Sequence, residues 1–280
     1  MSAYVVCVGL ATLDTIHVVP RHPAEDDLVL SSELAVAGGG PAATAAVTLA
    51  RLGVHTFFAG SIGDDEVGAK IREGLLREGV DISELTFVPG GCSPQSSILV
   101  GRGTRSIAAY RGALPPFALS ARAQKLCRGA SWVHVDQTGY AAASQERDQA
   151  RLSIDGGNPI EELDLDGIAL YGPTATALKD RFGTAGAALD AGAELVVVTR
   201  GSEGSAAYTQ CGEIVEAPAR PTEPVSTLGA GDVFHGALLA QLVRDAPLSD
   251  ALAFANEAAA LSCRALDGRS AIPTLEELAS

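Results

Sequence analysis

The stretch STLGAGDVFHGALLAQL, residues 226–242, joins a run of small residues to an acid and a long apolar segment. Its apolar pattern predicts a helix over Asp232–Arg244, with Gly229, Ala230 and Gly231 at the entrance. A Ser or Thr cap is the usual start of a helix, whereas here bare backbone N–H groups point at one place. A helix N-terminus carries about half a positive charge. The entrance can therefore hold an anion.

Two interpretations of this entrance are open on physical grounds. In the first, it holds a phosphoryl group during transfer, and Asp232 accepts the proton of an attacking hydroxyl as general base. In the second, Gly-Ala-Gly makes a tight turn, and Asp232 only complements the helix dipole.

Apolar runs and helical patterns alternate along the rest of the chain. Strands are predicted at 4–10, 54–60, 131–136, 150–155, 167–171 and 193–200, and further helices at 41–53, 66–78, 249–264 and 274–278. Repeated β-α-β units predict an α/β fold, with a mostly parallel central sheet and helices on both of its faces.

Two segments, about 14–36 and 92–112, interrupt this alternation. Residues 17–36 hold two apolar runs with no helix between them, and residues 96–111 have the pattern of a hairpin turning at Gly101–Thr104. They predict a small antiparallel sheet that covers the main one as a lid. Because no repeat or long linker is present, residues 1–280 are expected to form one domain.

The composition limits the partners and the location. The net charge of −14 argues against nucleic acid and anionic membranes, because such a chain gains nothing from counterion release. No apolar stretch reaches the ~20 residues of a bilayer span, and residues 1–14 lack the features of a signal peptide. Five scattered cysteines favour reduced thiols. A cytoplasmic protein is expected.

Several common catalytic motifs are missing. The sequence contains no Gly-Lys pair of a Walker-type loop, no H-E-x-x-H, no G-x-S-x-G and no G-x-G-x-x-G. The five histidines lack metal-site spacing, so no metal ligands are predicted. What remains are two glycine clusters, near the two ends of the chain.

Both clusters resemble signatures of one family. TLGAGDVFHGALLAQL resembles the C-terminal signature of the ribokinase-like, PfkB-type carbohydrate kinases, usually D-T-x-G-A-G-D, and the similarity continues through FANEAAALSC and IPTLEEL. GGGPAATAAVTLARLG, followed by GSIGDDEVG, resembles the N-terminal signature. The resemblance covers most of the chain. It implies a ribokinase-like fold and ATP-dependent phosphorylation of a sugar hydroxyl, with Asp232 as base and Gly229–Gly231 as the anion hole.

On the sugar side, the resemblance extends to single positions. Asp14 matches an acid that hydrogen-bonds sugar hydroxyls, and Gly39 and Gly40 match a di-glycine that lets backbone approach the sugar. Thr44 stands where ribokinases carry an asparagine. Each position also has a purely structural alternative. Asp14 could form a turn, the two glycines could only start a helix, and Thr44 could only pack in that helix.

On the nucleotide side, the resemblance is less specific. Thr199, Gly201 and Gly204 match the nucleotide loop, and Asn256 lies on the helix that usually borders the adenine. Magnesium is expected to be held mainly by ATP oxygens and water, because the segment 170–174 lacks the acid that the family often has there.

A second departure concerns the activating cation. Ser226 replaces an Asp that helps many family members to bind a monovalent cation, so activity is expected to be insensitive to K⁺. Arg264 or Arg269 is a candidate to supply the missing positive charge. Three alternatives to an active sugar kinase stay open: a catalytically impaired sugar- or nucleotide-binding regulator, a nucleoside kinase, and an unrelated α/β enzyme.

The substrate is less determined. GGGPAATAAV and GDVFHGALLA are especially similar to the sulfofructose kinase branch. A sulfonate favours arginine as its partner, and Arg105 and Arg111 on the predicted hairpin are the candidates, while VDQTGY at 135–140 offers no basic residue. Another ketose, a nucleoside or a polyol also remains open. The resemblance further implies a homodimer joined through the lids.

Overall fold

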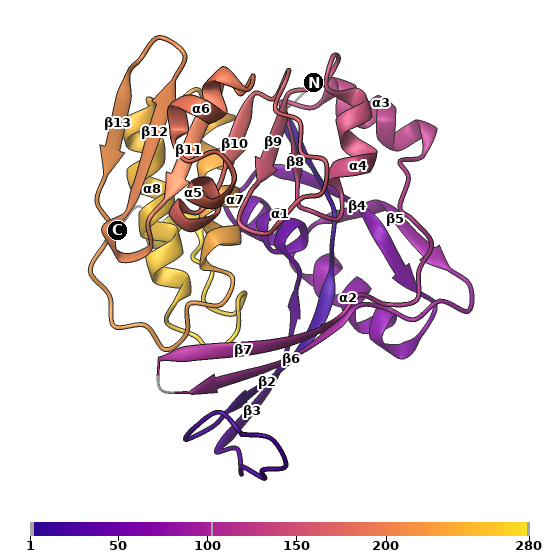
Figure 1. The fold of residues 1–280 in the computed structure, drawn as a ribbon. Helices are drawn as coiled ribbons and strands as arrows, with labels where there is room; N and C mark the ends of the chain where they lie inside the picture. Colours follow the sequence, from indigo (N-terminus) through magenta and orange to yellow (C-terminus); the bar gives the residue numbers. More distant parts are fainter. Residues whose placement is uncertain (1–2, 102, 279–280) are drawn as a thin grey trace.

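The computed structural model describes residues 3–101 and 103–278, and its main feature is a nine-stranded sheet (Figure 1). From edge to edge the strands are β13 (Ile214–Ala217), β12 (Ser205–Thr209), β11 (Leu195–Thr199), β10 (Leu170–Gly172), β9 (Leu152–Asp155), β8 (Trp132–Val135), β1 (Tyr4–Val8), β4 (His55–Gly63) and β5 (Asp81–Val88). All pairs are parallel except β11–β12 and β12–β13. The predicted α/β fold with a mostly parallel sheet is confirmed.

Helices cover both faces of this sheet. The core on one face contains residues of α1 (Pro41–Arg51), α2 (Glu66–Arg77), α7 (Ala230–Leu242) and α8 (Leu248–Ser262). The core on the other contains residues of α3 (Ala121–Gly129), α4 (Tyr140–Ala143), α5 (Ala175–Arg181) and α6 (Ala185–Asp190). The short helix α9 (Leu275–Leu278) packs on α8. Within the described ranges, every helix is too short or too polar to span a bilayer.

Strand β1 shows why the buried strands are continuously apolar. Val5 and Cys7 point into one core, whereas Val6 and Val8 point into the other. Since successive side chains alternate between the faces of a sheet, a strand covered on both faces needs apolar residues at every position.

A second, four-stranded sheet has the order β3 (Glu33–Gly39), β2 (Thr12–Val18), β6 (Gln95–Gly101) and β7 (Thr104–Tyr110). The two predicted segments form its antiparallel pairs, β2–β3 and β6–β7. They join through β2 and β6, which are parallel, so the layer is not antiparallel throughout. The pairing of Gly101 with Thr104 places the hairpin turn where it was predicted, although residue 102 lies outside the described residues.

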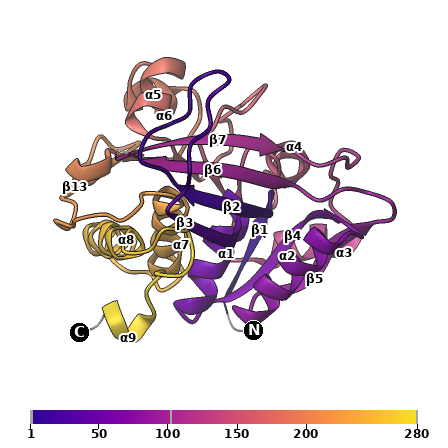
Figure 2. The ribbon, with the colours of Figure 1, turned by 90° about the horizontal axis from the view of Figure 1, so that it is seen from below.

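The small sheet lies beyond the carboxyl ends of the parallel strands of the main sheet, as Figure 1 shows. Viewed from below, β7, β6, β2 and β3 follow one another across the near side (Figure 2). Ligands of open α/β sheets bind outside the carboxyl ends of the strands, so the space between the two sheets is where a site is expected.

Candidate functional site

A cavity of about 390 Å³ lies between the two sheets and is called the central cavity here. Residues that directly follow β1, β8, β10 and other parallel strands line it from the main sheet, and β2, β6 and β7 line it from the small sheet. Nine of the predicted site residues contribute to its wall: Asp14, Gly39, Gly40, Thr44, Arg105, Thr199, Gly229, Gly231 and Asp232.

Five predicted residues are not part of this wall. Arg111 is exposed at the end of the small sheet, and the N–H of Ala230 donates to Thr227 O at 3.4 Å. Gly201 and Gly204 shape the loop after β11 through positive φ angles of 58° and 94°. Asn256 donates through Nδ2 to Ala217 O and Pro218 O at 3.0 and 3.2 Å, and so fixes the chain that leaves β13.

The entrance of α7 has the open backbone that the sequence indicates. Gly229 has a φ of 75°, and a Cβ there would lie 2.9 Å from Gly268 Cα, so only glycine fits. The helix has no side-chain cap, and the first N–H groups of a helix have no partner within it. At Gly231 a Cβ would meet no heavy atom within 4 Å. An anion therefore has both donors and room here.

Asp232 lies in the first turn of α7 and lines the same cavity. Burial raises the pKa of Asp232 well above its ordinary range, and the charges of Asp155 and Asp136 raise it further, whereas Arg269 lowers it. A carboxyl group with a raised pKa is a stronger proton acceptor once it is ionised. This suits a general base.

Asp14, on β2, is the buried carboxylate of the sugar-side wall. It accepts a hydrogen bond from Thr12 Oγ1 at 2.8 Å. Burial raises the pKa of Asp14, while hydrogen bonds from Thr12 and Ser96 and the charge of Arg269 lower it. A Cβ at Gly39 would overlap Asp14 Oδ2, so the glycine run leaves the space that this carboxylate needs.

Two acids that the sequence reasoning did not select lie at the carboxyl ends of main-sheet strands, and one of them, Asp155, lines the cavity. Asp136 accepts from the N–H groups of Leu10, Ala42, Thr138 and Gly139, and thereby ties the ends of β1 and β8 to the start of α1. Asp155 ends β9 and lines the cavity. Both are the last residues of the strands predicted at 131–136 and 150–155, a position that could have indicated them.

At Gly172 and Ser226 the sequence departs from the family pattern, and contacts within the structure explain both residues. A Cβ at Gly172 would overlap His235 Cε1, so no acid fits there. The Nε2 atom of His235 instead lies 3.6 Å from Asp155 Oδ1. Burial lowers the pKa of His235, and Asp155 partly offsets this. Ser226 Oγ accepts from Leu228 N at 3.2 Å, which supports the turn before the anion entrance.

The side chains around the cavity are compatible with a magnesium ion that is bound mainly by ATP oxygens and water. No group of three or more His, Cys, Asp or Glu residues suited to a metal ion occurs in the described part of the chain. Asp155 and Asp232 nevertheless both face the cavity that the anion entrance opens into. If a Mg²⁺ ion bound there, these two carboxylates would hold its water by hydrogen bonds, because Mg²⁺ dehydrates reluctantly.

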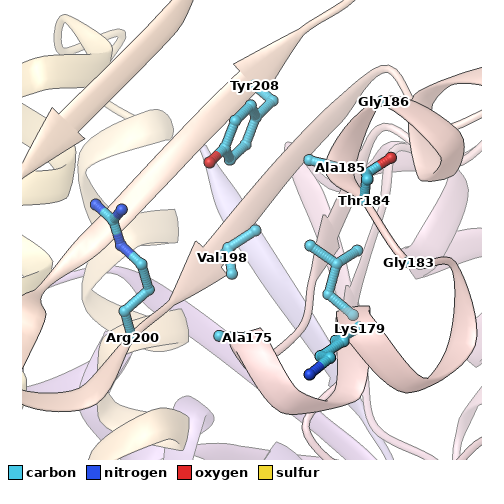
Figure 3. Close-up of a pocket in the computed structure, with 10 residues that line it drawn as sticks. Ala175, Lys179, Gly183, Thr184, Ala185, Gly186, Val198, Arg200 and Tyr208 are labelled. Carbon is cyan, nitrogen blue, oxygen red and sulfur yellow. The ribbon is translucent and has the colours of Figure 1, made fainter.

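A second cavity, of about 380 Å³, lies between α5, α6, β11 and β12 (Figure 3). Lys179, Thr184, Val198, Arg200 and Tyr208 are among its lining residues. The guanidinium of Arg200 is already engaged, because it donates to Glu216 Oε1 and Ser205 O. None of the predicted site residues lines this cavity, which leaves the central cavity as the candidate site.

Comparison with known proteins points to one family. Residues 2–150 and 174–275 match the model described as pfkB family carbohydrate kinase. The chain is 28% identical to the ribokinase of Bacillus subtilis, over 98% of this chain and 97% of that protein. It is also 28% identical to the ketohexokinase of Mus musculus, with 92% and 95% covered. The Arabidopsis thaliana ribokinase complexed with ribose and ATP has the same fold, with a TM-score of 0.83, 24% identity, and 100% and 98% of the two chains covered.

Proposed function

Because the chain belongs to the PfkB family of carbohydrate kinases, we propose that it transfers the γ-phosphoryl group of ATP to a hydroxyl of a small sugar or sugar-like molecule. One observation carries the proposal: the uncapped entrance of α7, Asp232 and Asp14 all face one cavity of about 390 Å³. The five cysteines are free thiols, which fits a cytoplasmic location. The whole chain then acts as one domain, with the small sheet as its lid.

Each part of the cavity has a role in this reaction. The N–H groups of Gly229 and Gly231 stabilise the charge of the transferring phosphoryl group, whereas that of Ala230 already donates to Thr227 O. Asp232 takes the proton of the attacking hydroxyl. Asp14 accepts hydrogen bonds from other sugar hydroxyls. Gln137 is a further candidate, because it lines the cavity and its buried Oε1 has no hydrogen-bond partner in the described residues. Thr199, which lines the same cavity, is the candidate for contact with the nucleotide.

Release of ADP over a panel of acceptors tests the function. The relatives provide the panel: ribose, ketohexoses, ribose 1-phosphate and 5-dehydro-2-deoxygluconate, to which sulfofructose and nucleosides are added. Turnover with a sugar supports the proposal. Binding of sugar and ATP without turnover would indicate the impaired regulator, and preference for a nucleoside would indicate the nucleoside kinase.

Arg105 is the residue that favours an anionic acceptor, as the sulfofructose branch requires. It lines the cavity from β7 and donates through Nη1 to Thr227 Oγ1 at 2.9 Å. Arg105→Gln is expected to raise KM for an anionic sugar by about 10–100-fold, because a hydrogen bond to a charged group is lost. KM values for neutral sugars should change little. Arg111→Gln is the matched control, and an equal effect of both variants would contradict this role.

Activity is expected to be insensitive to K⁺. Ser226 supplies no carboxylate, and its hydroxyl is engaged with Leu228 N. Turnover in K⁺-free buffer is compared with turnover in KCl at constant ionic strength. A several-fold activation by K⁺ over Na⁺ would show that other ligands maintain a cation site.

The small sheet is expected to join two copies of the chain. Its outer face exposes Leu34, Val36 and Tyr110, with 60%, 57% and 48% of their surface accessible. An exposed apolar strand surface of this kind favours association. Light scattering should give a dimer at micromolar concentration, and Leu34→Lys with Val36→Lys should give a monomer. A wild-type monomer would contradict the dimer.

A further inference from the structure

Arg269 places a buried positive charge beside the central cavity. Only 7% of its surface is exposed. In the described part of the chain its guanidinium makes no ion pair; instead it donates to two neutral oxygens, from Nε to Thr44 Oγ1 at 3.1 Å and from Nη2 to Gly39 O at 2.5 Å. Arg264, the other arginine considered from the sequence, is exposed and lies 4.0 Å from Glu277.

The backbone around Arg269 is held firmly. Asp267 Oδ1 accepts from the N–H groups of Arg269 and Ser270 at 2.8 and 2.7 Å. Arg51 donates to Ile272 O at 2.8 Å and forms an ion pair with Glu78. On the other side, a Cβ at Gly38 would overlap Arg269 Nη1. The side chain therefore has one well-defined position against the glycine run.

Carboxylates on several elements act electrostatically on this charge. Asp14 on β2, Asp232 on α7, Glu78 after α2 and Asp267 in its own loop all act on it. Burial lowers the pKa of Arg269 to about 10, so the guanidinium remains protonated near neutral pH.

Other charged groups act on the two carboxylates of the cavity. The charges of Asp155 and Asp136, at the ends of main-sheet strands, act on Asp232, and the charge of Asp267 acts on Asp14. His235 lies one turn after Asp232, and its pKa is lowered by burial. Several negative charges in one poorly hydrated place are unfavourable unless a positive charge compensates them.

We propose that Arg269 is a positioning residue of the kinase site: its fixed charge lets the Asp14 and Asp232 carboxylates share one cavity, and its two hydrogen bonds hold Thr44 and the glycine run against the sugar. The role of Arg269 in positioning the sugar rests on the proposed function. Its compensation of the charges of Asp14 and Asp232 concerns the folded protein alone and can be tested without a substrate.

The charge compensation by Arg269 predicts how the stability of the protein changes with pH. Burial raises the pKa values of Asp14 and Asp232 above those of the unfolded chain. Stability is therefore lost as the pH rises through the folded pKa values. Arg269 lowers both pKa values, so removing its charge costs nothing where both groups are protonated. The loss then grows as the pH rises towards neutrality, whereas a purely structural role gives a loss independent of pH.

Two substitutions separate charge from hydrogen bonding. Arg269→Gln removes the charge and keeps a donor, whereas Arg269→Lys keeps the charge and loses the forked geometry. Between about pH 4.5 and about pH 7.5, the Tm deficit of the Gln variant should grow by several degrees. That of the Lys variant should stay constant. Arg264→Gln is the surface control and should match the wild type throughout. In an Asp14→Asn, Asp232→Asn background, most of the pH-dependent part of the Gln deficit should disappear.

Kinetics with the substrate from the panel provide the second readout. The acid limb of kcat/KM should move to higher pH in Arg269→Gln and stay in place in Arg269→Lys, which should instead raise KM for the sugar. If the wild type phosphorylates nothing, the proposed function fails, yet the Tm series still decides the electrostatic role. If Arg269→Gln folds only at the acid end of this pH range, that result agrees with the proposal. A Gln deficit independent of pH, or a Lys deficit that grows with pH, overturns it.

Discussion

Asp232→Asn should lower turnover by roughly 10²–10⁴ while leaving ATP binding largely intact. The amide cannot accept the proton of the attacking hydroxyl, but it has nearly the same shape as the carboxylate. The same substitution should raise Tm, because burial raises the pKa of Asp232 and an ionised carboxylate there destabilises the folded protein near neutral pH. ADP release and thermal denaturation measure the two effects.

Because turnover should fall while Tm rises, loss of the base can be distinguished from misfolding of the variant. A misfolded variant would lose activity and Tm together, whereas loss of the base alone removes activity from a more stable protein. Asp190→Asn, at the exposed end of α6, is the control and should leave turnover unchanged. Near wild-type turnover in Asp232→Asn would end the assignment of Asp232 as base.

Gly231→Ala should lower turnover and raise KM for ATP, together by about 10–100-fold in kcat/KM. A Cβ at this position meets no protein atom within 4 Å, so it extends into the space proposed for the phosphoryl group. A displacement of about 1 Å at a reacting group can cost about 10²-fold in rate. Gly231→Val should have the larger effect, and steady-state kinetics at varied ATP measures both variants.

Gly74 provides a matched control for this substitution. It also lies in a helix, α2, and a Cβ there likewise meets nothing within 4 Å. Alanine in place of a helical glycine stabilises by about 0.5–1 kcal/mol, so Gly74→Ala should raise Tm with unchanged kinetics. Gly231→Ala should not lower Tm either. Full activity in Gly231→Ala would show that the phosphoryl group does not bind at this entrance.

Much of the fold follows from local patterns in the sequence. Strand β1 and helices α1, α2, α7 and α8 lie within about two residues of their predicted bounds, because their apolar spacing, glycines and prolines act over a few residues. Strands β5, β12 and β13 were not predicted. β5 and β13 each have only one buried position, so they lack the continuous apolar run of a central strand.

The features of the site likewise fall into those that the local sequence predicts and those that only the tertiary structure shows. The sequence by itself determined the uncapped glycine entrance of α7, Asp232 in its first turn and the two interrupting segments, since these are short-range features. Only the tertiary structure decided that β2 pairs in parallel with β6, that Asp155 lines the cavity, and that Arg269 rather than Arg264 is buried. Those contacts join residues up to 230 positions apart. They depend on strand order and packing, which the local pattern of a single segment does not specify.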